Sequence, residues 1–264
     1  MLRLINQLLE FRKMQNNKLA LSLEETDVMA FLYEIFLSFN DAAESKNMDF
    51  KFLPSVASYK MFIDKGYLDK VTYNLLSNAF KYTPSGGKVT FSVTVDEAKK
   101  QLVISVADSG VGIPKEKRNE LFKRFMQSSF SGSSVGVGLH LTHELVCVHK
   151  GTIVYTENEG GGSIFTVSLP TDISVYEEKD FLIPHNVLLE EEEVHHAAVL
   201  AEEISAQEGE VELPSAPLNK RKVLIIEDDN DVREFLKEEV GQYFEVVAEA
   251  DGPSGLERAR TYDA

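Results

Sequence analysis

Polar residues that could bind a metal–nucleotide complex recur at short spacing in the segment NLLSNAFKYTP, residues 74–84. Asn74, Asn78 and Lys81 stand four and three residues apart, so in a helix they share one face. Amide oxygens are ligands for magnesium, and a lysine ammonium pairs with phosphate charge. The segment therefore predicts a magnesium–nucleotide site, although alone this spacing fits the solvated face of an amphipathic helix equally well.

A second candidate is the sequence DSGVG, residues 108–112, which directly follows a predicted strand. Asp108 offers a carboxylate, which can accept a hydrogen bond from the exocyclic amine of adenine. Gly110 and Gly112 have no side chain, so the backbone there can approach a bound ring closely. Alone, such a turn would be unremarkable, and its weight comes from its place among the other motifs.

Further along the chain lies a segment suited to phosphate. Gly136 and Gly138 precede a predicted helix, whose free N–H groups and positive dipole end attract phosphate. Residues 113–137 are expected to form a lid, in which a short helix is followed by the small residues 128–134. Arg124 in this lid is a candidate phosphate ligand, although such residues are more often surface charges.

The elements that must position these motifs are a mixture of helices and antiparallel strands. Capping residues and apolar residues at helical spacing predict helices beginning at Thr26–Asp27, Asp64 and Gly138. Alternating apolar residues predict strands at 19–23, 50–53, 60–63, 89–95 and 102–106, and a last hairpin at 152–169. This mixture predicts an α+β fold, a two-layer α/β sandwich with helices on one face of a sheet.

The motifs in this order resemble the N, G1, F and G2 boxes of the histidine kinase catalytic domain, a member of the Bergerat-fold ATPases. The likeness covers residues 18–170 and implies ATP and magnesium as cofactors. It implies Asn74, Asn78 and Lys81 as catalytic residues, with the two asparagines near the metal. The residues that it implies around the nucleotide are Asn78, Lys81, Tyr82, Asp108, Gly110, Gly112, Arg124, Gly136, Gly138 and Leu139.

The flanking segments resemble other parts of a hybrid two-component sensor kinase. Residues 1–17, which contain LRLINQLLEFRKMQ, resemble the end of a helix of the dimerisation and phosphotransfer bundle. Residues 171–219 hold most of the acidic excess and are expected to be a linker. Residues 220–264 resemble the first part of a response-regulator receiver, an incomplete doubly wound α/β domain. On that match, Glu227 and Asp228 would belong to its magnesium site.

None of the six histidines stands in the His-Glu-x-Arg-Thr-Pro context that the family phosphorylates. Three of them are expected on a helix face or at a helix end, namely His140, His143 and His149. The receiver segment ends before the strand that would carry its phosphoacceptor aspartate. The expected partners are therefore ATP, a histidine-bearing bundle and a complete receiver of the parent protein, with a homodimer in the intact kinase.

Two other functions remain to be weighed against a kinase. Hydrolytic ATPases of the same fold place a glutamate where this chain has Asn74, and an amide cannot act as a general base. The sequence therefore favours phosphoryl transfer to histidine over hydrolysis. The remaining alternative is a non-catalytic ATP-binding module of the same fold, which would hold a nucleotide without chemistry.

Composition excludes several classes of protein. The net charge of −16 argues against direct nucleic-acid binding, which needs clustered Lys and Arg. A single cysteine, Cys147, excludes a disulfide framework and fits a reducing cytoplasm. No apolar run approaches the roughly 20 residues that span a bilayer. We therefore expect the cytoplasmic part of a membrane-anchored parent, as the resemblance implies.

Overall fold

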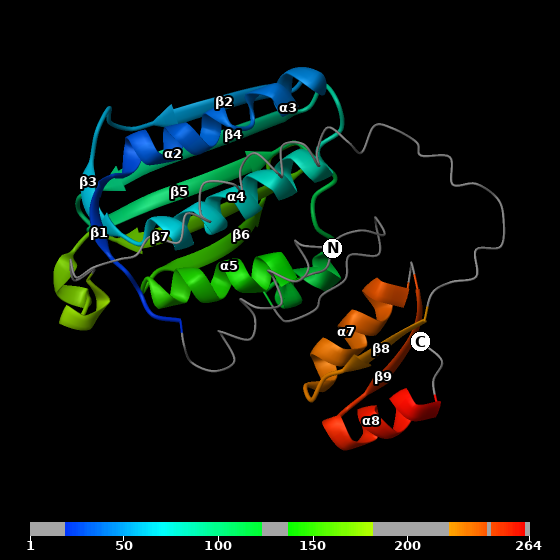
Figure 1. The fold of residues 1–264 in the computed structure, drawn as a ribbon. Helices are drawn as coiled ribbons and strands as arrows, with labels where there is room; N and C mark the ends of the chain where they lie inside the picture. The colour runs from blue at the N-terminus through cyan, green and yellow to red at the C-terminus, as the bar shows by residue number, and fades with distance from the viewer. Residues whose placement is uncertain (1–18, 123–136, 182–221, 242–243, 262–264) are drawn as a thin grey trace. The chain divides into compact units, whose positions relative to one another are not determined.

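The computed structural model describes residues 19–122, 137–181, 222–241 and 244–261 (Figure 1). These residues form two compact units, one reaching to Phe181 and the other beginning at Lys222. The helix expected at 1–17 lies outside the described residues. So do most of the expected lid and most of the expected linker.

A five-stranded sheet is the base of the first unit. Its order is β2 (Asp49–Pro54), β4 (Lys88–Asp96), β5 (Gln101–Asp108), β7 (Ser163–Pro170) and β6 (Thr152–Glu157). The β2–β4 pair is parallel and the other pairs are antiparallel. The sheet brings the end of β5 beside the start of β7, although the two lie far apart in the chain.

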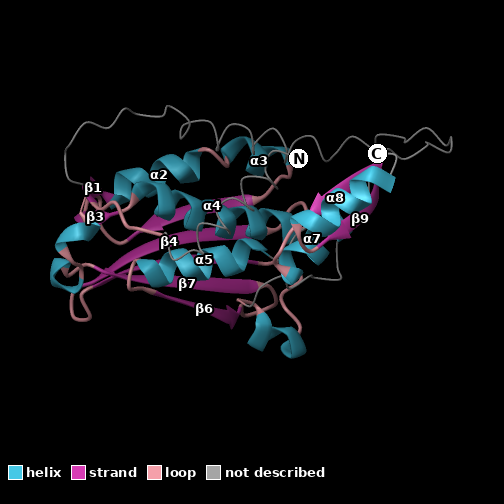
Figure 2. Ribbon diagram, turned by 60° about the horizontal axis from the view of Figure 1, so that its bottom comes forward, coloured by secondary structure: helices cyan, strands magenta, loops and turns pink. Residues whose placement is uncertain are grey.

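Three helices cover one face of this sheet: α2 (Val28–Leu37), α4 (Lys65–Tyr82) and α5 (Val137–Val148) (Figures 1 and 2). A short helix, α3 (Asn40–Ser45), follows α2. A small antiparallel pair, β1 (Glu24–Asp27) and β3 (Lys60–Ile63), lies outside the main sheet. The predicted two-layer α/β sandwich is confirmed.

Aspartates begin two of the helices, as predicted from the sequence. Asp27 accepts hydrogen bonds from the backbone N–H groups of Met29 and Ala30 at the start of α2. Asp64 accepts one from Tyr67 at the start of α4. These bonds satisfy N–H groups that have no partner within the helix, so the cap residues fix where each helix begins.

Alternation along the strands builds the core between the two layers. Most side chains of β4 and β5 that point toward the helices are buried, while their neighbours are half-buried or exposed. On α4 the buried residues are Leu68, Val71, Thr72, Leu75, Leu76, Ala79 and Phe80. This buried stripe fixes the rotation of α4 about its axis. The polar residues outside the stripe therefore lie on the flanks of the helix, away from the core. In the part of the chain described, no helix is long and apolar enough to cross a membrane.

Two segments differ from the expectation. The strand expected at 19–23 begins only at Glu24, because Leu23 has a single bridge, to Phe181, in place of a ladder. The segment after Pro114 forms a 3-10 helix, Lys115–Glu120.

Beyond β7 the chain continues in two 3-10 turns, and Tyr176 packs on Leu21 and Leu23.

The second unit alternates strands and helices. It contains β8 (Lys222–Ile226), α7 (Asn230–Gly241), β9 (Glu245–Glu249) and α8 (Gly252–Thr261). The two strands pair in parallel, as the continuous apolar run KVLII predicted. Val232 on α7 is buried.

Candidate functional site

Asp108 lies at the end of β5 and is nearly enclosed, with 5% of its surface exposed. Its Oδ1 accepts hydrogen bonds from two backbone N–H groups, of Gly110 at 2.8 Å and of Ser163 at 3.1 Å. Burial raises the pKa of this carboxyl above its ordinary value, and the two N–H bonds act in the opposite direction. The carboxyl is therefore held in one orientation at the rim of the sheet.

Glycines let the backbone segments around Asp108 approach one another closely. A Cβ added at Gly162, where φ is +101°, would lie 2.0 Å from the Asp108 carbonyl oxygen. One added at Gly110 would lie 2.4 Å from the Tyr82 carbonyl oxygen. Gly112 has a φ of +66° and faces Gly162. The turn at 110–112 therefore packs tightly between α4 and the β6–β7 hairpin.

The hairpin between β6 and β7 supplies residues that the motifs did not indicate. Ser163 is 5% exposed and donates its backbone N–H to Asp108. The Asn158 side-chain amide donates to the Asp108 carbonyl oxygen at 2.7 Å. The hairpin itself was predicted at 152–169, but its sequence does not reveal which strand end it contacts.

Asn74 connects the two helices that flank the candidate site. Its amide nitrogen donates to the Thr142 hydroxyl of α5 at 2.8 Å, and that hydroxyl donates to the Gly138 carbonyl at 2.9 Å. A Cβ added at Gly138 would lie 2.4 Å from the Asn74 amide oxygen. A side chain at Gly138 would therefore displace the Asn74 amide, so this glycine also contributes to the packing of α5 on α4. Thr142 was not indicated by sequence.

Asn78 and Lys81 follow Asn74 along α4 and are half-buried. The Asn78 side chain makes no hydrogen bond with the described residues. The Lys81 ammonium lies 5.5 Å from the centre of the Tyr82 ring, within cation–π range. The helix therefore brings an amide and a cation to the side on which the Gly110 turn and the start of α5 also lie.

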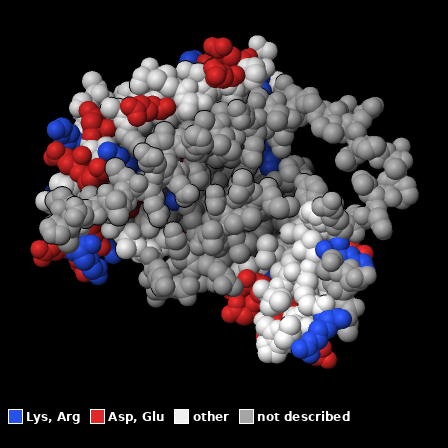
Figure 3. Space-filling view, viewed as in Figure 1, with Lys and Arg blue, Asp and Glu red and all other residues white. Residues whose placement is uncertain are grey.

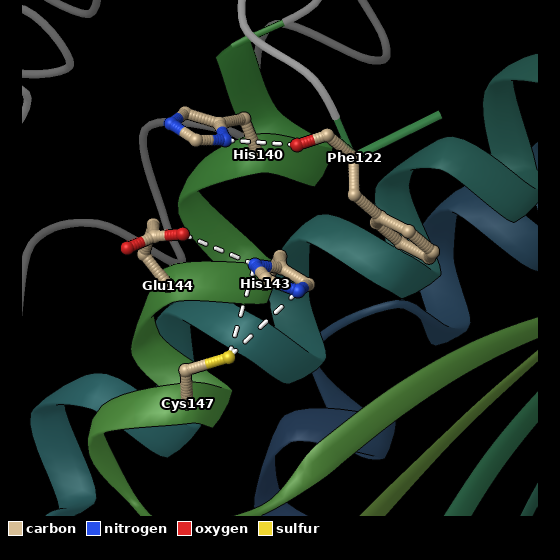
Figure 4. A network of polar contacts seen from close by, with 5 residues as sticks. All are labelled: Phe122, His140, His143, Glu144 and Cys147. Carbon is tan, nitrogen blue, oxygen red and sulfur yellow. Dashed lines mark hydrogen bonds and ion pairs between the residues drawn. The ribbon is translucent and has the colours of Figure 1, made fainter. Parts of the chain in front are cut away.

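The outer side of α5 carries a polar cluster that also reaches the end of the 113–122 segment (Figure 4). The Nδ1 atom of His140 lies 2.9 Å from the Phe122 carbonyl oxygen. The His143 ring stacks on the Phe122 ring at 5.6 Å and bonds to Glu144 at 3.1 Å. The Sγ atom of Cys147 lies 3.7 Å from Nε2 of His143.

His149 follows α5 and is buried, with 2% of its surface exposed. Its Nδ1 bonds to the Leu145 carbonyl at 2.9 Å, and its Nε2 accepts the backbone N–H of Asp64 at 3.3 Å. Burial lowers the pKa of this imidazole. His140, His143 and His149 are therefore on a helix or at its end, as predicted.

The remaining predicted site residues fall into three groups. Arg124 and Gly136 lie outside the described residues, and Leu139 is half-buried against the core. Glu227 and Asp228 belong to the second unit, where Glu227 is buried and accepts the Asp229 N–H at 3.3 Å. No three His, Cys, Asp or Glu side chains in the described ranges form a group that could hold a metal ion.

The site formed by Asp108, the glycine turns and the start of α5 lies within a segment that matches a known protein family. Residues 63–173 match the family described as histidine kinase-, DNA gyrase B- and HSP90-like ATPase. These residues form a histidine-kinase-like ATPase domain. The ATPase domain contains every described candidate residue of the first unit, from Asn74 to Leu139, and also Asn158 and Ser163.

Relatives extend the likeness beyond the ATPase domain. Histidine kinase P4 of Formosa agariphila is 32% identical over 98% of this chain, which covers 19% of that protein. Sensor histidine kinase TmoS of Ectopseudomonas mendocina is 30% identical over 97% of the chain, which covers 26% of that protein. The chain thus spans about a fifth to a quarter of the length of these relatives. These matches support the conclusion that the chain contains the catalytic domain of a sensor histidine kinase.

Solved structures have the same fold. The histidine kinase AdeS of Acinetobacter baumannii is 26% identical, with a TM-score of 0.53 over 64% of this chain and 77% of that chain. Full-length ShkA, in complex with AMPPNP, gives a TM-score of 0.59 over 97% of this chain and 47% of that chain. At 21% identity, the second likeness concerns the fold alone. The expected Bergerat ATPase fold of the ATPase domain is confirmed.

Proposed function

We propose that this chain is the ATP-binding catalytic part of a hybrid two-component sensor histidine kinase. It transfers the γ-phosphoryl group of ATP to a histidine outside this chain, as the first step of a phosphorelay. The observation that carries the proposal is the oriented Asp108 carboxyl, packed against the glycine turns of an ATPase domain.

The proposed position of ATP follows from the chemistry of the surrounding residues. Adenine donates its exocyclic amine to the Asp108 oxygen that does not receive the Gly110 and Ser163 N–H groups. The phosphates extend toward the start of α5, where helix N–H groups attract anions. Lys81, with its ammonium beside the Tyr82 ring, contributes positive charge on the α4 side.

Magnesium fits the donors on α4. The Asn78 amide has no hydrogen-bond partner among the described residues, so its oxygen is available to a cation. Magnesium in nucleotide sites takes most of its ligands from phosphates and water, so one or two protein oxygens suffice. Asn74 is the second candidate, because its bond to Thr142 uses the amide nitrogen and leaves the amide oxygen as an acceptor. When bound, the ion would neutralise phosphate charge.

Phosphoryl transfer needs little covalent chemistry from the ATPase domain. A neutral imidazole nitrogen of the acceptor attacks the γ-phosphorus, and a P–N bond forms. The bond between that phosphorus and the bridging oxygen breaks, ADP leaves, and the imidazolium releases its N–H proton to water. Positioning and charge neutralisation therefore dominate catalysis, and Asn74 supplies no carboxylate to activate water for hydrolysis.

The second unit supports the hybrid architecture. Its βαβα order with a parallel strand pair is the order expected for the first part of a receiver, with Glu227 and Asp228 following β8. P4 and TmoS match nearly the whole chain, including this unit. A further relative, from Dictyostelium discoideum, is named hybrid signal transduction histidine kinase D and is 31% identical over 64% of the chain.

The proposed partners belong to the parent protein. They are a histidine-bearing dimerisation bundle, a complete receiver and a second copy of the intact kinase, on the cytoplasmic side of a membrane. On the face shown in Figure 3, most of the described Lys and Arg side chains lie close to acidic ones. Ion pairs such as Lys60–Glu25 and Lys65–Glu24 are part of the same first unit. This interleaving supports protein partners over nucleic acid.

The test combines ATP binding with phosphoryl transfer. The chain is incubated with magnesium and γ-labelled ATP, alone and with a separately prepared bundle domain that carries a phosphoacceptor histidine. We expect label only on the added bundle, and none when its histidine is replaced by glutamine. Binding without label on the bundle would support the non-catalytic ATP-binding module, and no binding would overturn the proposal.

A further inference from the structure

We infer that His140 is a positioning residue for the ATP phosphates, because its imidazole ties the segment Ile113–Phe122 to the first turns of α5. The inference rests on the proposed function, since it assigns a role in binding ATP. The segment follows the Asp108 turn in the chain, and its last residue, Phe122, contacts α5 through His140, so it connects the adenine end of the proposed site to the phosphate end.

The start of this segment is fixed by Arg118. Its Nε donates to the Ile113 carbonyl at 2.9 Å, and its guanidinium pairs with Glu157 at 3.0 Å. The same guanidinium lies 5.5 Å from the centre of the Tyr155 ring. Both partners belong to β6, so the beginning of the segment is bound to the sheet on which Asp108 lies.

The end of the segment is fixed by His140. Figure 4 shows its Nδ1 directed at the Phe122 carbonyl, at 2.9 Å. A carbonyl oxygen only accepts hydrogen bonds, so Nδ1 carries the hydrogen. The Phe122 ring stacks on His143, one turn further along α5. The backbone and the ring of Phe122 are therefore both held by α5.

The stability of the fold does not by itself explain why residue 140 is a histidine. Its Nε2 is buried and has no hydrogen-bond partner among the described residues. A buried nitrogen without a partner costs free energy of folding, which an apolar side chain of similar size would avoid. The group that distinguishes His140 from such a side chain is the Nδ1–H, and its one contact in the described structure is the Phe122 carbonyl.

The hydrogen bond between His140 and Phe122 completes a set of contacts around the first turns of α5. On the inner side, Asn74 bonds to Thr142 and leaves no space for a side chain at Gly138. On the outer side, His140 bonds to Phe122. The N–H groups that would meet the phosphates are thereby fixed relative to the Asp108 carboxyl. Loss of the His140–Phe122 hydrogen bond should weaken phosphate binding and leave adenine binding intact.

The experiment compares ATP with adenosine, which has the base but no phosphates. Affinities for both are measured by calorimetry on the full chain, for the wild type, His140→Leu and His140→Asn. Asparagine keeps an N–H donor near the position of Nδ1, whereas leucine keeps only the volume. Glu144→Gln, on the same side of α5, is the control.

We expect His140→Leu to weaken ATP binding roughly tenfold, the effect of losing one buried hydrogen bond, with unchanged adenosine affinity and undiminished thermal stability. His140→Asn should recover most of the ATP affinity, and Glu144→Gln should match the wild type. Equal ATP affinity in all variants would overturn the inference. So would a His140→Leu chain that unfolds or loses adenosine equally, because His140 would then be a packing residue. Failure of the wild type to bind ATP would refute the proposed function itself.

Discussion

The Asp108 carboxyl accepts a hydrogen bond from the backbone N–H of Ser163 at 3.1 Å, although the two residues are 55 positions apart in the chain. Asp108 ends β5 and Ser163 begins β7, and these strands are antiparallel neighbours. A carboxyl held by an N–H from the neighbouring strand cannot rotate freely. The β6–β7 hairpin therefore helps to decide which oxygen of Asp108 meets a ligand.

Asp108→Asn should weaken ATP binding by about tenfold to a hundredfold. The Gly110 and Ser163 N–H groups require an acceptor at Oδ1, so the new amide nitrogen takes the other position. There it would place a donor against the donor amine of adenine. Calorimetric titration with ATP measures the loss. Asp96→Asn, at the other, half-buried end of the β4–β5 pair, is the control and should bind normally. An unchanged affinity in Asp108→Asn would refute the adenine assignment.

Gly162→Ala should destabilise the chain far more than Gly160→Ala. Both glycines have a positive φ, which costs about 1–2 kcal/mol for alanine at either position. Only at Gly162 does the added Cβ meet another atom, the Asp108 carbonyl oxygen at 2.0 Å, whereas nothing lies within 4 Å at Gly160. The difference in the free energy of unfolding, measured in urea, should exceed ~2 kcal/mol. Equal losses would mean that the hairpin can move away from Asp108 at little cost.

Asn78→Ala should remove the magnesium dependence of ATP binding and leave the fold intact. The amide makes no hydrogen bond with the described residues, so its loss leaves no buried group without a partner. ATP affinity is compared with magnesium and with EDTA, and circular dichroism monitors the fold. If magnesium still strengthens binding to the same extent, other groups hold the ion.

Thr142→Val should lower the free energy of unfolding by about 1–3 kcal/mol. Valine keeps the shape of Thr142, which is 1% exposed, but leaves the Asn74 amide nitrogen without its acceptor. Thr142→Ser keeps the hydroxyl and serves as the matched variant. Urea titration of the three chains measures the free energy of unfolding. A greater loss of stability in Thr142→Ser than in Thr142→Val would show that the methyl group matters more than the hydrogen bond.

His149 should make stability depend on pH. Its folded-state pKa is lowered from 6.5, chiefly by burial, so below about pH 6.5 the unfolded chain binds more protons than the folded one. Stability contributed by this group therefore falls as the pH is lowered through that window. Protonation would also turn Nε2, which accepts the Asp64 N–H, into a donor.

The measurement for His149 is thermal unfolding at pH 7.5 and 5.5. His149→Asn cannot be protonated, so we expect it to be less stable at pH 7.5 but to lose less on acidification than the wild type. An identical loss in both chains would assign the pH dependence to other groups.

Local patterns in the sequence were sufficient for most of the secondary structure. Asp27 and Asp64 were recognised as helix caps, because their side chains act within three residues of their own position. Alternation identified β4 and β5, because one face of each strand is buried. The expected strand at 19–23 was wrong in its position, because a strand also needs a partner, and Leu23 finds only Phe181, far along the chain.

By itself, the sequence determined the order of the ATP motifs and the chemistry of their side chains, since residue type and spacing carry that information directly. Only the tertiary structure decided which residues meet. The Asn74–Thr142 bond joins two helices, and the contact of Ser163 with Asp108 depends on the pairing of β5 with β7. Such contacts depend on the register of strands and the rotation of helices, which the burial of the whole core determines. No local segment contains that information.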